Sequence, residues 1–286
     1  MRERVRSNQR PLLVVDGDSF AHRAYHALPK TIHRRNDGGP GNALVGFTSM
    51  LLRLWQRERP RAVLVAWDTL DVPTYRHTAF SGYQGGRVFD ADLLGQLDLL
   101  PSLVRSAGLA CAKEPGYEAD DFLAAAAAFE ETAGGNALVA TSDRDAFQLA
   151  SARTTILQPV RGEEPARIGP AEVRERYGVD PEQVPDFIAL RGDPSDRIPG
   201  ARGVGEKGAA ELLTQYRSLE VMLGEGRFAA EAEALRLFRT LATLDRSAPL
   251  PPLPDAPPDW AAAAACAREL GSDGLAARLE EAASST

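Results

Sequence analysis

The sequence predicts an α/β fold in which helices flank a mainly parallel central sheet, with a helical subdomain attached. Apolar runs of strand length recur at residues 11–16, 61–68 and 136–141, and a further strand is expected at 154–160. Segments with helical spacing separate these runs, and strands that alternate with helices build parallel sheets. From about Gly169 onward the strand pattern stops, and short helices with glycine-rich turns follow.

Each element has its own local signal. The runs PLLVVD and RAVLVAWD are continuously apolar, which is typical of strands buried on both faces. Apolar residues recur at helical spacing at 42–57, 92–107 and 117–132. Gly108 follows the second of these segments and is a good helix stop. We divide the chain into an α/β region that would carry the active site, residues 1–170, and a helical region, residues 171–286, in which a proline-rich stretch at 248–258 precedes the last helical segment.

Composition narrows the class of protein. The chain has 286 residues and 44% hydrophobic content, enough for a substantial core. Its two cysteines, Cys111 and Cys266, suggest no disulfide framework and fit a reducing cytoplasm. No apolar run approaches the ~20 residues of a membrane span. The first ten residues are basic but lack the apolar stretch of a signal peptide, and we interpret them as a tail rather than a nucleic-acid-binding arm.

The acidic residues carry the functional signal. A net charge of −7 argues weakly against a nucleic-acid partner, unless many carboxylates converge on metal ions. Asp16 and Asp68 end two predicted strands, and Asp143 follows a third. Because the carboxyl ends of parallel strands lie along one edge of a sheet, these residues should converge there.

The complete set of candidate metal ligands is Asp16, Asp68, Glu118, Asp120, Asp121, Asp143, Asp145, Asp193 and Asp196. Carboxylate clusters suit two Mg²⁺ or Mn²⁺ ions held about 4 Å apart, the arrangement that hydrolyses phosphodiester bonds. Four histidines, and two cysteines without ligand spacing, do not suggest a zinc site.

Each acid also has a purely structural interpretation. Acids at 118–121 would offset a helix dipole, and Ser142 with Asp145 could form a capping box. Asp193 before Pro194 is a good start for a type I turn. Taken singly, these interpretations are the more common ones. The placement of three acids at strand ends makes them jointly a poor explanation, and we favour the metal site.

Several motifs together resemble the 5′-nuclease (flap endonuclease) family, which includes the 5′–3′ exonuclease domain of bacterial DNA polymerase I. They read VVDGDSFAHRAYHALP, YRHTAFSGYQGGR, GYEADD, TSDRDAFQL and RGDPSDRIPGARGVGEKGAAELL, and the resemblance covers nearly the whole chain. It implies metal ligands at the same nine acids and a helical arch at about 74–90. In that arch Tyr83 would stack on a base, and Arg76 and Arg87 would contact phosphates. Without room for a polymerase, the chain looks like a stand-alone member.

Two positions depart from the family pattern. Gln84 stands where the family usually has a lysine beside the scissile phosphate, and Arg197 stands where it often has asparagine. Glutamine can donate a hydrogen bond but brings no charge, so we expect weaker stabilisation of the developing negative charge at this position. Gln84→Lys should then raise the cleavage rate.

Residues 198–213 predict a hairpin between two helices that binds DNA. The amides of Gly203, Val204 and Gly205 can approach a phosphate at a helix N-terminus, and Lys207 adds a charge. Backbone amides carry no sequence code, so binding should be independent of sequence. The resemblance makes this the helix–hairpin–helix region, with K⁺ on turn carbonyls. The expected partner is duplex DNA with a 5′ flap, nick or 5′ end, bound by a monomer.

Three other functions were weighed. A haloacid-dehalogenase-type phosphatase would use Asp16 as nucleophile and Asp18 as acid/base, but the GDPSD segment would then have to follow a strand, and it follows a helical pattern. A non-catalytic DNA-binding relative would explain Gln84 but not the retained acids, which repel one another without metal. The hairpin favours duplex DNA over the substrate of an RNA-cutting PIN-domain relative.

Overall fold

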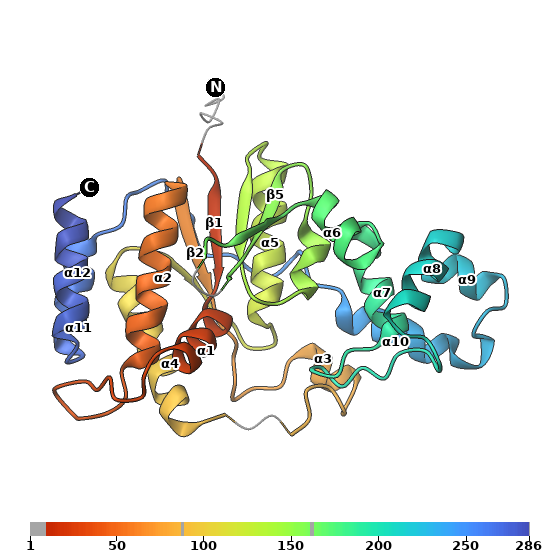
Figure 1. Cartoon of the computed structure of the whole chain (residues 1–286), viewed down its shortest axis with the longest axis horizontal. Helices are drawn as coiled ribbons and strands as arrows, with labels where there is room; N and C mark the ends of the chain where they lie inside the picture. Colours follow the sequence, from red (N-terminus) through yellow and green to blue (C-terminus); the bar gives the residue numbers. More distant parts are fainter. Residues whose placement is uncertain (1–9, 87–88, 161–162, 286) are drawn as a thin grey trace.

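A parallel sheet with helices on both faces forms the main body of the computed structural model, which describes residues 10–86, 89–160 and 163–285 (Figure 1). In these residues six strands form one sheet in the order β3-β2-β1-β4-β5-β6. All neighbours are parallel except β5 and β6. The strands are β1 (Leu12–Asp16), β2 (Ala62–Ala66), β3 (Ala110–Ala112), β4 (Ala137–Ala140), β5 (Thr154–Gln158) and β6 (Ala166–Ile168).

The predicted α/β class and parallel sheet are confirmed, and the apolar runs explain why. Every residue of β1, β2 and β4 is buried, as expected for strands covered on both faces. Two short edge strands were not predicted. Strand β3 has only three residues, with the sequence ACA, and β6 is an antiparallel three-residue strand in a polar segment, so neither has an apolar run long enough to be noticed.

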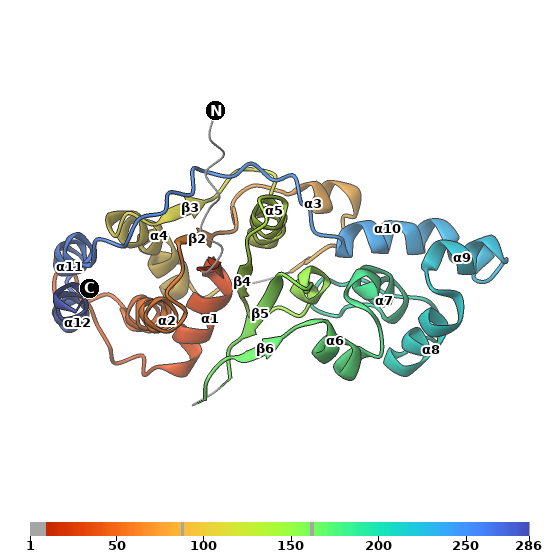
Figure 2. The same ribbon diagram turned by 90° about the horizontal axis from the view of Figure 1, so that it is seen from above.

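Two sets of helices cover the two faces of the sheet (Figure 2). One face packs against α1 (Gly17–Ala27), α2 (Asn42–Glu58) and α4 (Ala91–Ser106). The other packs against α5 (Ala119–Thr132), whose alanines are small enough to let the helix lie close to the strands. Helix α1 begins directly after β1 and was not predicted, although the Asp16 side chain caps it by accepting from Ser19 N.

A helical lobe, residues 170–242, extends from the edge of the sheet near β6 and contains most of the predicted second region (Figure 2). Its helices are α6 (Pro170–Tyr177), α7 (Val184–Arg191), α8 (Glu206–Tyr216), α9 (Leu219–Gly224) and α10 (Ala232–Ala242). Their buried residues join the same core as α5, so the lobe continues one face of the sheet.

The last two helices do not pack with that lobe. Helices α11 (Trp260–Glu269) and α12 (Asp273–Ser284) lie at the opposite end of the molecule, against α4 and α2 (Figure 1). We had assigned them to the helical region with the hairpin. The alanine-rich sequence predicted the helices but not their partner, because their buried face would fit either half of the protein.

The predicted arch is much less helical than expected. Between residues 74 and 86 the structure has only the five-residue helix α3 (Tyr75–Ala79), followed by turns. Three glycines at 82, 85 and 86 explain why the helix does not continue, since glycine disfavours helix and Gly86 has a φ of +77°. Elsewhere in the described chain, no helix is both long and apolar enough to span a membrane.

A close contact at Gly17 should control stability. A Cβ placed there would lie 2.5 Å from Trp67 Cε3 and 2.7 Å from the carbonyl oxygen of Ala66. Gly17→Ala should therefore lower the free energy of unfolding by about 1–3 kcal/mol through overpacking. Gly95→Ala is the matched control, because Gly95 lies inside α4 with no atom within 4 Å, and it should gain about 0.5–1 kcal/mol. Urea unfolding measures both changes, and equal effects would contradict this account.

Candidate active site

A pocket of about 600 Å³ opens at the carboxyl ends of the central strands and is lined by acids. Its wall includes Asp16, Asp18, Asp68, Glu118, Asp120 and Asp143. Asp16 is the last residue of β1, Asp68 follows β2, and Asp143 follows β4. The first turn of α5 contributes Asp120. The structure thus brings five of the nine predicted ligands to one pocket.

Short hydrogen bonds fix the orientation of these carboxylates. Asp16 Oδ2 accepts from Thr141 Oγ1 at 2.6 Å, which ties the end of β1 to the end of β4. The same Thr141 oxygen accepts from the backbone N–H of Asp143 at 3.0 Å. Asp68 Oδ1 accepts from Ala119 N at 2.7 Å, which ties β2 to the start of α5. The pocket wall is therefore built by contacts between strand ends that are far apart in sequence.

Burial and mutual repulsion make these carboxylates costly to ionise. Burial, followed by the charges of Asp68 and Asp143, raises the pKa of Asp16 to about 7. Burial also raises the pKa of Glu118 to about 7, with Asp68 and Asp121 adding to the shift. Asp120 keeps some surface open to the pocket, but protein surrounds it on its other sides, and its pKa is well above the usual value. A bound cation would offset all these costs at once.

The donor set suits a hard divalent cation. Carboxylate oxygens line the pocket, and protein donors orient the carboxylates of Asp16 and Asp68. Within the described ranges no three acidic, histidine or cysteine side chains are arranged as an ion site.

Asp145, Asp193 and Asp196 lie beside the pocket rather than in its wall. Burial and the charges of Asp143, Asp196 and Asp193 raise the pKa of Asp145 well above its usual value. Asp193 accepts from Ser195 N at 2.7 Å and pairs with Arg191 at 3.1 Å. This second acidic group is therefore near enough to the first to interact with it through Asp143 and Asp145.

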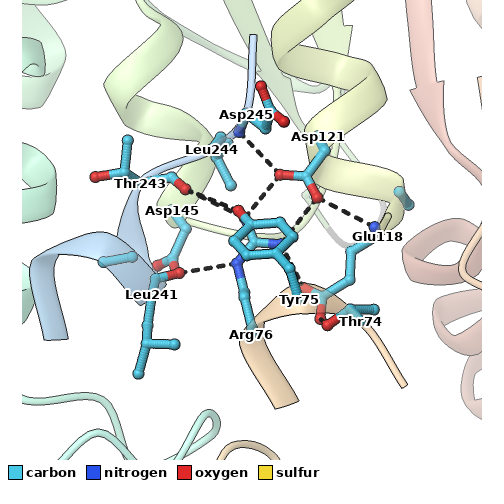
Figure 3. Close-up of polar contacts among 12 residues, drawn as sticks. Thr74, Tyr75, Arg76, Glu118, Asp121, Asp145, Leu241, Thr243, Leu244 and Asp245 are labelled. Carbon is cyan, nitrogen blue, oxygen red and sulfur yellow. Dashed lines mark hydrogen bonds and ion pairs between the residues drawn. The ribbon is translucent and has the colours of Figure 1, made fainter. Parts of the chain in front are cut away.

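Asp121 differs from the other eight predicted ligands (Figure 3). Its Oδ1 and Oδ2 accept from the two terminal guanidinium nitrogens of Arg76 at 2.7 and 2.9 Å, and both side chains are buried. Asp121 Oδ1 also accepts from Asp245 N at 2.9 Å. With both oxygens occupied, Asp121 holds the arginine instead of facing the pocket, so the metal-ligand role expected from the resemblance does not match its position.

Arg76 also differs from its expected role as a phosphate contact. It is 1% exposed and donates to the carbonyl oxygens of Leu241 and Thr243 at 2.9 and 3.2 Å (Figure 3). Burial opposes its charge, but the hydrogen bond to Asp121 and the charges of Glu118 and Asp121 outweigh burial and raise its pKa. The guanidinium therefore joins α3, α5 and the end of α10.

Tyr83 and Gln84 face the acids. The Tyr83 hydroxyl donates to Glu118 Oε2 at 3.0 Å, and the ring is buried, edge-on to His77. A buried ring does not offer a face to a DNA base, so stacking would require the segment to move. Gln84 Nε2 donates to Asp196 Oδ1 at 3.0 Å, and Gln84 lines the pocket. The third predicted arch residue, Arg87, lies outside the described residues.

Sequence reasoning undervalued Asp18 and missed Thr141. Asp18 is buried in the pocket wall, its Oδ2 accepts from Asp68 N at 2.8 Å, and burial with the charge of Asp68 raises its pKa. The Asp-x-Asp spacing after a strand was a signal, but we weighed it only for a phosphatase. Thr141 gave no signal, because a threonine at a strand end is common.

The predicted hairpin forms between α7 and α8. Ala201 N donates to the Leu190 carbonyl at 2.8 Å, which folds the turn back onto α7. Gly203 has a φ of +77°, and no atom lies within 4 Å of a Cβ built there or at Gly205. The glycines therefore leave the N-terminus of α8 open, and Lys207 is exposed on its first turn.

Family models match the chain over almost all of this architecture. Residues 11–178 match the 5′-3′ exonuclease N-terminal resolvase-like domain, and residues 179–259 match its C-terminal SAM fold. The chain belongs to the 5′-3′ exonuclease family. The family resemblance deduced from the motifs is confirmed, and so is the prediction of a nuclease at the level of this family. Helix α7 before Asp193, where a phosphatase needs a strand, agrees with rejection of that rival.

Curated relatives are DNA polymerases I. That of Mycobacterium tuberculosis is 40% identical over 256 residues, covering 85% of this chain and 28% of the polymerase. That of Thermus aquaticus is 42% identical over 213 residues, covering 74% of this chain and 25% of the polymerase. The chain therefore spans about a quarter of the length of these relatives.

Solved structures share the fold at low sequence identity. T5 5′-exonuclease with bound zinc has a TM-score of 0.69 at 18% identity, covering 96% of this chain and all of that one. The catalytic core of Rad2 in complex with DNA substrate has a TM-score of 0.61 at 14% identity, covering 96% of this chain and 93% of that one. Neighbours of this fold are thus crystallised with divalent metal ions and with DNA, which is consistent with a metal-dependent nuclease.

Replacement of Asp120 and of Asp121 by asparagine should change the free energy of unfolding in opposite directions. The folded protein holds the Asp120 proton more tightly than the unfolded chain, so Asp120 favours folding near pH 4 and disfavours it as the pH rises. At pH 8 in chelator, Asp120→Asn should therefore raise the free energy of unfolding. Asp121→Asn should lower it by about 3–5 kcal/mol, since Arg76 loses its buried partner.

Denaturant unfolding of both variants at pH 8 and pH 5 measures these changes. The gain in Asp120→Asn should shrink at the lower pH, where the carboxyl of the folded wild-type protein is more fully protonated. Equal destabilisation by the two variants would contradict the different roles that the structure gives Asp120 and Asp121.

Proposed function

We propose that this chain hydrolyses DNA phosphodiester bonds at or near 5′ ends, as a 5′–3′ exonuclease and 5′-flap endonuclease that leaves 5′-phosphate products. The pocket at the strand ends carries this proposal, because it gathers acids whose pKa values are raised by burial and by one another's charges, a cost that bound cations would offset. Family membership supports the same reaction class. Replication and repair are the processes in which such ends arise.

Two Mg²⁺ or Mn²⁺ ions are the proposed cofactors. Asp16, Asp68, Asp120 and Asp143 would hold them, with Glu118 and the neighbouring group of Asp145, Asp193 and Asp196 completing the donor set. Such ions, when bound, polarise the phosphate and lower the pKa of the attacking water. K⁺ on the hairpin turn carbonyls is a further proposal that rests on the family resemblance alone.

The protein's own contribution is to hold the pocket carboxylates in defined orientations. Thr141 and the backbone N–H groups of Ser19 and Ala119 orient Asp16 and Asp68 before substrate arrives. Tyr83 donates to Glu118 and so holds that carboxylate toward the arch segment. Preorganised groups of this kind avoid reorganisation during the reaction, which is a main source of enzymatic rate enhancement.

The hairpin is the proposed duplex-binding element. The open turn at Gly203 and Gly205 allows a phosphate to approach the first amides of α8, and Lys207 adds a mobile charge. Duplex DNA with a 5′ flap, nick or 5′ end is the proposed partner. A monomer in the cytoplasm is the proposed form, and the two half-buried free cysteines fit that compartment.

Cleavage should require a divalent cation. Purified protein and 5′-flap DNA are incubated with Mg²⁺, with Mn²⁺ and with excess chelator, and the product ends are tested for a 5′-phosphate. Asp143→Ala should abolish cutting while the fold survives, since Asp143 is exposed and its carboxylate accepts from Asp145 N within the same turn. Its control is Asp92→Ala, an exposed acid in the first turn of α4 that should leave cutting unchanged. Full cleavage in chelator would contradict the proposed chemistry.

The affinity for duplex DNA should fall steeply as the salt concentration rises and should not depend on the DNA sequence. Gly205→Ala leaves the backbone unstrained but places a methyl group beside the α8 amides, so it should weaken affinity for every duplex alike. Lys207→Gln should reduce the slope of log affinity against log salt by about 1. Gly224→Ala is the control, an equally open glycine at the end of α9. Strong preference among unrelated duplexes would count against backbone recognition.

A further inference from the structure

Arg197 occupies a strained position in a tight loop. Asp193 and Ile198 exchange two backbone hydrogen bonds of 2.8 Å, which close the loop over residues 193–198. Arg197 has a φ of +57°, in the left-handed region that asparagine and glycine tolerate better than other residues. Such strain persists where the surrounding structure enforces it and is frequent at functional sites.

The Arg197 guanidinium lies against the arch segment. A Cβ built on Gly85 would be 3.3 Å from its Nη1, and one built on Gly86 would be 3.0 Å from its Nη2. Two successive glycines thus leave the space that the guanidinium fills. Gln84 strengthens the same contact, because its backbone N–H donates to the Asp196 carbonyl at 3.2 Å and its side chain donates to Asp196 Oδ1.

Arg197 forms no ion pair with any of the described residues. Arg76 pairs with Asp121 and Arg191 pairs with Asp193, but within the described ranges Arg197 has no carboxylate within 4.0 Å. The side chain is exposed. It therefore carries a positive charge beside Gly85 and Gly86, next to Gln84, which lines the acidic pocket, and no carboxylate of the described residues neutralises it.

We propose that Arg197 contacts the phosphate at or next to the bond being cleaved and supplies the positive charge that the neutral Gln84 does not. This inference rests on the proposed nuclease function. A guanidinium can donate two parallel hydrogen bonds to a phosphate, and such charge-assisted bonds are roughly twice as strong as the neutral bond available to glutamine. The loop residues 193–198 thus join the arch segment in forming the substrate site.

The tests are Arg197→Asn, Arg197→Lys and the double variant Gln84→Lys with Arg197→Asn. Asparagine removes the charge and suits the left-handed backbone, so Arg197→Asn should keep or raise the melting temperature. The single-turnover rate on 5′-flap DNA with Mg²⁺ should nevertheless fall about ten-fold or more. Arg197→Lys keeps the charge and should retain more of the rate than Arg197→Asn.

The decisive comparison is the effect of Gln84→Lys in two backgrounds. In Arg197→Asn protein, the new lysine should restore most of the lost rate, because it returns a positive charge to the same rim. In wild-type protein, where Arg197 already acts, the gain should be at least about five-fold smaller. A purely structural role for Arg197 would move the melting temperature and would not be rescued by lysine at another position.

Three outcomes distinguish the hypotheses. An unchanged rate in Arg197→Asn, or equal gains from Gln84→Lys in both backgrounds, would overturn the role of Arg197 while leaving the nuclease function intact. A lower rate that follows a lower melting temperature would also overturn it. If wild-type protein fails to cut flap DNA with Mg²⁺ or Mn²⁺, the proposed function fails and this inference fails with it.

Discussion

Repulsion among buried carboxylates at one edge of the sheet is the constraint on which the rest of the structure depends. Parallel strands deliver Asp16, Asp68 and Asp143 to the same edge, where burial and the charges of Asp68 and Asp143 raise the pKa of Asp16. The fold counters the repulsion by giving the pocket acids separate hydrogen-bond donors, such as Thr141 for Asp16 and the start of α5 for Asp68. The repulsion lowers local stability, and under the proposed function bound cations would offset it.

The buried pair of Arg76 and Asp121 is what holds the surrounding segments in place against that repulsion. It connects the arch segment, the first turn of α5 and the chain after α10 through five hydrogen bonds from the guanidinium to protein oxygens. Removal of either charge would leave the other buried and unpaired. In this structure Asp121, an acid that resembles a metal ligand in sequence, is the counterion of Arg76, and the charge of Arg76 is neutralised within the protein.

The central strands and the acids at their ends could be predicted from the sequence. Continuous apolar runs that end in aspartate predicted the central strands and the acids at their ends, because burial on both faces leaves a strong signal. The edge strands β3 and β6 were missed since three residues carry no periodicity. Asp120 and Asp121 could not be told apart, because adjacent helical residues point about 100° apart and only the fold shows which one faces the pocket.

The predictions for the arch and for the packing of the last two helices were wrong for related reasons. Glycines at 82, 85 and 86 permit many backbone conformations, so local sequence there does not fix a structure. Helices α11 and α12 are alanine-rich, and their shallow apolar faces fit several surfaces. Arg197 gave only one hint, a large charged residue at a position suited to asparagine, and its meaning depends on a contact with residues 85 and 86 that no local pattern encodes.

The return of α11 and α12 to α2 and α4 makes the helical lobe an insertion within the α/β body rather than a domain on the end of a tether. The chain enters the lobe after β6 and leaves it after α10, and both crossings are fastened to the sheet half. A segment held at two points has far fewer orientations than one held at a single point. The distance between the hairpin and the acidic pocket is thereby restricted in the free protein, so under the proposed function a duplex bound at the hairpin would be cut at a set length from it.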